Sequence, residues 1–198
     1  TYTVVLEVKE HTLGNNQLCS VCGAEMADIL KYTCPSCQTT EPVEWHPWRG
    51  GYLNTQDCNG KHYYLVRDIS GRGQIHIGAD KTADANGATI EVCIDLHGNN
   101  ISKPRTNGTT GADGSFRAFA VYNGSTLNLM NTEAGESIVE ASYNRDRGGV
   151  INLAGESNLN LYSGVTLQGN DPEPFRFAGG IVAVNGGTFT MYGGKLIG

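Results

Sequence analysis

The chain has 198 residues, of which 39% are hydrophobic and 17% charged, and 27 are glycine. This composition excludes a charge-rich disordered chain and a helical bundle, and it predicts frequent turns. The formal charge is −6 and no basic run occurs, so nucleic acid is excluded as a partner. No stretch reaches the roughly 18 consecutive apolar residues that span a bilayer, so membrane insertion is not expected either.

The first ten residues have the alternation of a half-buried strand. In "YTVVLEVKE", Val4, Leu6 and Val8 alternate with more polar neighbours. Because this pattern begins at the first residue, we interpret residues 1–10 as the terminal strand of an upstream domain, or as a linker. The chain is then expected to be a piece of a longer protein. A signal peptide is not visible in this segment.

Two Cys-x-x-Cys pairs follow, Cys19 with Cys22 and Cys34 with Cys37. Each pair places two thiolates on one tight turn, and two such turns that face each other form the tetrahedral sulfur site that zinc prefers. The sequence therefore predicts a zinc-ribbon-like segment over residues 11–50 with a structural Zn bound by these four cysteines. Four thiolates leave no open coordination position, so a catalytic metal is not expected.

Other roles remain open for the histidines and cysteines. The two pairs would form disulfides if the chain is exported. His11 and His46 lie near the pairs and could replace a cysteine ligand, although a surface histidine is the commoner case. Cys58 and Cys93 lie outside the pattern, and the sequence leaves open whether they form a disulfide or stay as free thiols.

The second half of the chain repeats with a period of about 30 residues. Short segments with two apolar residues separated by one other residue are each followed by a Gly or Asn turn. The expected columns are Ile94, Leu127, Leu159 and Phe189; Leu96, Leu129, Leu161 and Met191; Phe119, Ile151 and Val182; and Val121, Leu153 and Val184. Leu167 and Ile197 suggest a third strand in each unit. Such columns predict an all-β fold, a parallel β-helix over residues 51–198, whose inward side chains stack from coil to coil.

These residues resemble a known family. The β-helix half resembles the pectin-lyase-like right-handed parallel β-helix repeat proteins of bacterial cell surfaces. The resemblance is carried by His11, Cys19, Cys22, Gly23, Trp45, Trp48, Tyr63, Tyr64, Leu65 and the run Ile94 to Gly98. It implies a right-handed solenoid and an extracellular or bacterial cell-surface location, and it implies no activity.

Catalytic residues are not predicted. Parallel β-helices often act on polysaccharides, and Asp146, Asp171 and Glu173 are the candidate carboxylates, but each lies in a segment typical of a solvated turn. "DKTADANG" resembles a calcium loop but lacks the closing Glu. Tyr162 and Tyr192 should face outward on adjacent coils, where they would either stabilise the sheet or stack against a sugar ring.

The sequence therefore predicts a non-catalytic surface module with an architectural or adhesive role. Its partner would be a polysaccharide or a host surface glycan, bound in part by Tyr162 and Tyr192. The alternative is a fragment of a polysaccharide lyase or glycoside hydrolase whose catalytic residues lie on other coils. The last coil carries no cap in this sequence, which favours either further coils or self-association through that coil.

Overall fold

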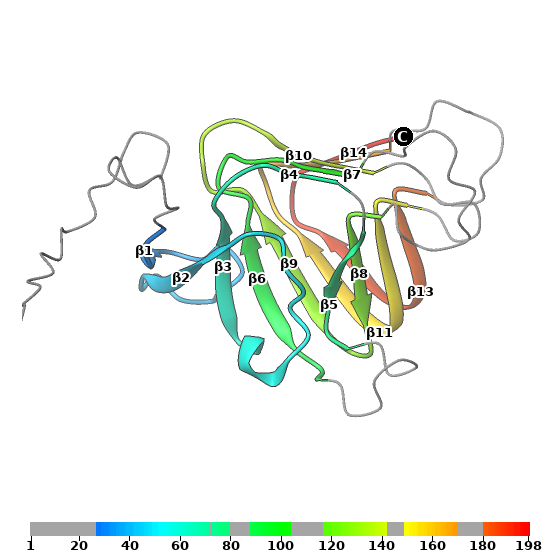
Figure 1. The fold of residues 1–198 in the computed structure, drawn as a ribbon, viewed down its shortest axis with the longest axis horizontal. Helices are drawn as coiled ribbons and strands as arrows, with labels where there is room; N and C mark the ends of the chain where they lie inside the picture. Colours follow the sequence, from blue (N-terminus) through cyan, green and yellow to red (C-terminus); the bar gives the residue numbers. More distant parts are fainter. Residues whose placement is uncertain (1–26, 72, 80–87, 104–116, 142–148, 170–179) are drawn as a thin grey trace, which may run out of the picture.

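The computed structural model describes residues 27–71, 73–79, 88–103, 117–141, 149–169 and 180–198 (Figure 1). Within these ranges the protein is nearly all-β and contains no α-helix. A single-turn 3-10 helix, η1, spans Gln56–Cys58. The strands are β1 (Leu30–Tyr32), β2 (Val43–Trp48), β3 (Lys61–Leu65), β4 (Ile69–Ser70), β5 (Ile75–Ile77), β6 (Glu91–Asp95), β7 (Ile101–Lys103), β8 (Phe119–Tyr122), β9 (Thr126–Met130), β10 (Ser137–Ala141), β11 (Ile151–Leu161), β12 (Val165–Gly169), β13 (Val182–Met191) and β14 (Lys195–Ile197).

Successive coils of the chain stack in parallel and form a β-solenoid (Figure 1). The first strand of each coil lies in the row β3, β6, β9, β11 and β13, and the second strand lies in the row β4, β7, β10, β12 and β14. The third strand is β5 or β8 in the earlier coils and the first half of β11 or β13 in the later ones. The strands β11 and β13 are long because each contains the third strand of one coil and the first strand of the next. Among the strands of the described ranges, β1 alone pairs antiparallel, with β2. The predicted parallel β-helix is confirmed.

Most of the predicted columns are confirmed by the strand register. Leu127 pairs with Leu159, and Leu159 pairs with Phe189. In the next column Leu129 pairs with Leu161, and Leu161 pairs with Met191. The columns on the third strands, which begin at Phe119 and Val121, are also found. Side chains two residues apart point the same way on a strand, so these columns form the interior.

The register predicted for the first of these coils is wrong by two residues. Val92, not Ile94, pairs with Leu127, and Ile94, not Leu96, pairs with Leu129. Val92, Ile94 and Leu96 are all completely buried. The alternation of inward and outward residues is therefore the same whether Val92 or Ile94 is paired with Leu127. The strands expected around Leu167 and Ile197 are found as β12 and β14, but Leu196, not Ile197, pairs with Leu167.

The main core fills the interior of the solenoid. It contains inward side chains of the coils before the last one, among them Leu65, Ile94, Leu129 and Leu161, none of which has any exposed surface. In the last coil Val182 and Phe189 pack against this core, whereas Val184 and Met191 are exposed. A second and smaller apolar cluster lies outside this core and contains Trp45, the outward-facing Cys93 and Met130. Within the described residues, no helix has the length and apolar character needed to cross a membrane.

Candidate metal centre

The second cluster exists because the N-terminal hairpin segment, residues 27–48, folds over the outer face of the solenoid. Val92 and Ile94 point into the core, so Cys93 between them points outward. Tyr32 on β1 stacks on Trp45 on β2, with ring centroids 4.7 Å apart and planes 5° apart. In the turn that follows β1, Cys37 contacts His62 on β3 and Ser36 contacts Cys93 on β6.

Four potential metal ligands meet at these contacts. The ligand atoms of Cys34, Cys37, His62 and Cys93 all lie within 4.8 Å of one another. Cys34 and Cys37 lie on one tight turn, in which the Cys37 N–H donates to the Cys34 carbonyl at 3.1 Å. His62 and Cys93 are neighbours across the parallel pair β3 and β6. Two ligands thus come from the hairpin segment and two from the solenoid.

Short contacts join the four side chains in two pairs, Cys37 with His62 directly and Cys34 with Cys93 through Ser36. Cys37 Sγ lies 3.1 Å from His62 Nε2. Ser36 Oγ lies 3.0 Å from both Cys34 Sγ and Cys93 Sγ, so this hydroxyl bridges the two buried thiols. Cys34 is 3% exposed and Cys93 is 6% exposed, which excludes most solvent from the group.

The thiols of the group influence one another's ionisation. Hydrogen bonding by Cys93, with further hydrogen bonds from His62 and Ser36, lowers the pKa of Cys34 to about 3. The same contact with Cys34, together with burial, raises the pKa of Cys93. Burial, and then Cys34, raises the pKa of Cys37. A bound divalent cation would favour the deprotonated form of all three thiols, because the thiolate is the form that binds a metal.

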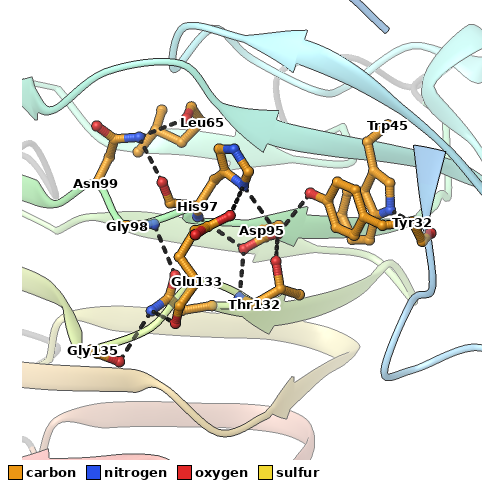
Figure 2. A network of polar contacts seen from close by, with 11 residues as sticks. Tyr32, Trp45, Leu65, Asp95, His97, Gly98, Asn99, Thr132, Glu133 and Gly135 are labelled. Carbon is orange, nitrogen blue, oxygen red and sulfur yellow. Dashed lines mark hydrogen bonds and ion pairs between the residues drawn. The ribbon is translucent and has the colours of Figure 1, made fainter. Parts of the chain in front are cut away.

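A polar network beside the cysteines attaches the hairpin segment to two coils (Figure 2). The Asp95 carboxylate has no exposed surface, and it accepts hydrogen bonds from the Tyr32 hydroxyl at 2.7 Å and from the Thr132 N–H at 3.0 Å. It also accepts the His97 N–H at 2.8 Å and the Thr132 hydroxyl. Burial opposes ionisation of Asp95, but the hydrogen bonds from His97, Thr132 and Tyr32 outweigh it and lower its pKa.

His97 lies at the edge of this network. Its Nδ1 is 3.8 Å from Asp95 and 3.4 Å from Glu133, and Asp95 raises the pKa of the imidazole against the opposing effect of burial (Figure 2). Its ring stacks on Tyr32 at 6.0 Å and contacts Tyr64 edge-on at 5.2 Å. Tyr64 in turn donates its hydroxyl to the Asp28 carbonyl at 2.7 Å. The hairpin segment is thus held by hydrogen bonds and ring contacts in addition to the cysteines.

The structure places two of the four predicted zinc ligands in the cluster. Cys34 and Cys37 form the expected turn, whereas Cys19 and Cys22 lie outside the described residues, so their part in the site stays a prediction. The sequence prediction missed His62 as a ligand and left Cys93 unassigned. The only signal for either is that their strands pair in register, which requires the solenoid alignment to be known.

Two other residues named from the sequence have different surroundings. His46 packs its ring at 6.2 Å from Tyr63 and is not a member of the cluster. Cys58 is a free thiol that packs against the main core, while Cys93 is a free thiol in the outer cluster, so the two form no disulfide. The carboxylates considered for catalysis, Asp146, Asp171 and Glu173, lie outside the described residues, as does the whole of the segment "DKTADANG".

The tyrosines considered for glycan binding lie on adjacent coils beside the metal centre. The rings of Tyr162 and Tyr192 stack with centroids 5.1 Å apart and planes 20° apart, and Tyr192 is 67% exposed. Tyr162 packs against the outer cluster. Burial, followed by Tyr192 and the thiols of the cluster, raises the pKa of Tyr162 to about 12.

Comparison of the chain with models of protein families, with curated proteins and with solved structures gave no significant match. No family is therefore identified. The fold and the site together define a parallel β-solenoid that carries a buried group of three cysteines and one histidine, able to hold a metal ion.

Proposed function

We propose that this chain is a non-catalytic architectural module of an extracellular or bacterial cell surface, in which a structural zinc ion fastens the N-terminal hairpin segment to the solenoid. The observation that carries the proposal is the meeting of Cys34, Cys37, His62 and Cys93 within 4.8 Å. Residues 34 and 37 belong to the segment that is fastened, and residues 62 and 93 belong to two successive coils. One ion would therefore join three parts of the chain.

Zinc is the metal that these ligands fit best. Three thiolates and one imidazole are a common ligand set of structural zinc sites, and soft sulfur ligands disfavour magnesium and calcium. With four protein ligands the tetrahedral coordination is complete, so no position is left for a substrate or for a reactive water. This supports a structural role for the metal and a non-catalytic role for the module around it.

The adhesive part of the proposal is supported by the outer surface of the solenoid. Tyr162 and Tyr192 bring aromatic surface to the edge of the metal centre, and aromatic rings with a polar edge are suited to contact with sugars. The predicted surface location is supported by the resemblance described from the sequence.

The metal assignment can be tested on the purified chain. We expect one zinc per chain, and a cobalt-substituted form whose thiolate-to-metal absorption corresponds to three sulfur ligands. His62→Ala and Cys93→Ser should each lower the zinc content and the melting temperature. Cys58→Ser is the matched control for zinc content, because this thiol lies outside the cluster, and it should leave the zinc content unchanged.

The same experiment separates the two possible ligand sets. The double variant Cys19→Ser/Cys22→Ser should keep its zinc if His62 and Cys93 are ligands. It should lose zinc if the two Cys-x-x-Cys pairs form the site, in which case cobalt absorption of the parent would indicate four sulfurs. Purified chain without zinc, whose melting temperature is unaffected by added zinc or by a chelator, would refute the structural metal altogether.

A further inference from the structure

Two rows of uncharged polar side chains cross the outer face of β9, β11 and β13. The first row contains Thr126, Asn158 and Thr188, and the second contains Asn128, Asn160 and Thr190. These positions alternate along each strand with the inward Leu127, Leu159 and Phe189, so they point away from the core. On the preceding strand, β6, the first row meets Glu91, which pairs with Thr126, and the second row meets Cys93, which pairs with Asn128. Asn128 also donates its Nδ2 to the Glu91 carboxylate at 3.1 Å, so a negative charge borders the rows at this end.

Hydrogen bonds within the rows fix the directions of the amides. Asn160 donates its Nδ2 to Asn128 Oδ1 at 2.8 Å, and Asn158 donates to the Thr126 hydroxyl at 3.4 Å. Four atoms in the rows have no hydrogen-bond partner among the described residues. They are Asn158 Oδ1, Asn160 Oδ1 and the hydroxyl oxygens of Thr188 and Thr190. Asn158, Asn160 and Thr190 are half-buried and Thr188 is exposed, so these atoms are available to a ligand.

The rows are regularly spaced, because the three strands pair in register. Neighbouring strands lie about 4.8 Å apart, and residues two apart on a strand are separated by about 6.6 Å. Tyr162 and Tyr192 follow the second row on their strands, two residues after Asn160 and Thr190 respectively, and their rings stack on each other. None of the row positions on the three strands carries a charge, although the chain as a whole has a formal charge of −6.

We propose that this face, made of Asn158, Asn160, Thr188, Thr190 and the Tyr162–Tyr192 pair, binds a neutral polysaccharide. Oriented amides and hydroxyls match the hydroxyl groups of sugars, and the tyrosines supply the apolar surface on which a ring can rest. An acidic polymer is disfavoured, because the face offers no cation to neutralise its carboxylates. The inference rests on the proposed adhesive role and names its ligand class, but it uses none of the metal ligands.

Affinity electrophoresis of the zinc-loaded chain through gels that contain a β-glucan, a xylan, a mannan or polygalacturonate tests the proposal. We expect retention by at least one neutral polymer and none by polygalacturonate. Thr188→Val/Thr190→Val keeps the branched shape that suits a strand but removes two hydroxyls, and it should weaken binding about 10-fold or more. Tyr192→Ala should weaken binding to a similar extent. Gln168→Ala, on the outer face of β12, is the matched control and should leave binding unchanged.

Retention by none of the neutral polymers would overturn the proposal, as would retention by polygalacturonate alone. Unchanged binding of a neutral polymer by both the double valine variant and Tyr192→Ala would also overturn it. Zinc content and melting temperature are measured on the same samples. Normal values together with absent binding would refute the binding face and leave the metal-fastened module intact, whereas absent zinc with retained binding would refute only the metal assignment.

Discussion

Truncation of Leu129 tests whether the stacked columns hold the solenoid together. Leu129 on β9 has no exposed surface and lies between Ile94 on the preceding coil and Leu161 on the following one, which are also fully buried. Leu129→Ala would leave a cavity with packed side chains on both sides along the column. Because neither neighbour can move without leaving its own contacts, we expect the cavity to collapse little.

The size of the effect follows from this position. Buried Leu→Ala substitutions cost about 2–5 kcal/mol, and we expect about 4 kcal/mol for Leu129 because its site is closed on both sides. Leu161→Ala should cost less, about 3 kcal/mol, because its neighbour Met191 is 45% exposed and its surroundings can relax. The difference between the two variants is therefore part of the prediction.

Urea unfolding of the zinc-saturated protein, followed by circular dichroism, measures these free energies by linear extrapolation. A second spectroscopic probe should give the same transition, since stacked repeats do not always unfold in two states. Asn160→Ala, one residue from Leu161 but facing outward, is the control and should cost less than either leucine variant. A loss below about 1 kcal/mol for Leu129→Ala, or a loss no larger than that of the control, would refute the stacking of these columns.

Two further predictions concern the network in Figure 2. Asp95→Asn removes a buried charge that accepts hydrogen bonds from Tyr32, His97 and Thr132. We expect the free energy of unfolding to fall by about 3 kcal/mol and amide exchange in β1 to become faster. An unchanged unfolding midpoint would contradict this. The raised pKa of His97 means that its stabilising contribution is complete below its ordinary pKa of about 6.5 and is lost as the pH rises through the raised value. The urea midpoint of the parent relative to His97→Gln should therefore fall between pH 5.5 and pH 8.5, and a relative rise over this range would show the reasoning to be wrong.

The sequence was sufficient to predict the solenoid because its evidence is local and repeated. Each coil carries two inward residues separated by one outward residue, and the same short pattern returns with Gly or Asn turns between the copies. The predicted register failed by one residue at β14 and by two residues at β6. At β6, Ile90, Val92, Ile94 and Leu96 form one continuous alternation and all are buried. A shift of two residues preserves the inward pattern, so this segment alone does not determine its own alignment.

The Cys34, Cys37, His62 and Cys93 group, which could hold a metal ion, was harder to predict because it depends on contacts that are distant in sequence. The turn at Cys34 and Cys37 has a recognisable spacing, and it is found. His62 and Cys93 have no such spacing, and they meet only because β3 pairs with β6 in one particular register. His46 is closer in sequence to the cysteine pair than His62 is, yet its side chain contacts Tyr63 instead. Proximity along the chain was therefore a poor guide to the histidine ligand.

The position of the hairpin segment has a mechanical consequence. With an ion bound, residues 34 and 37 are cross-linked to residues 62 and 93, and the chain between them forms closed loops. A tensile load applied from the N-terminal side would reach the metal–sulfur bonds before it reached the hydrogen bonds between β3 and β6. The first coils would then be shielded from peeling, and the force needed to extend them would depend on whether the ion is present.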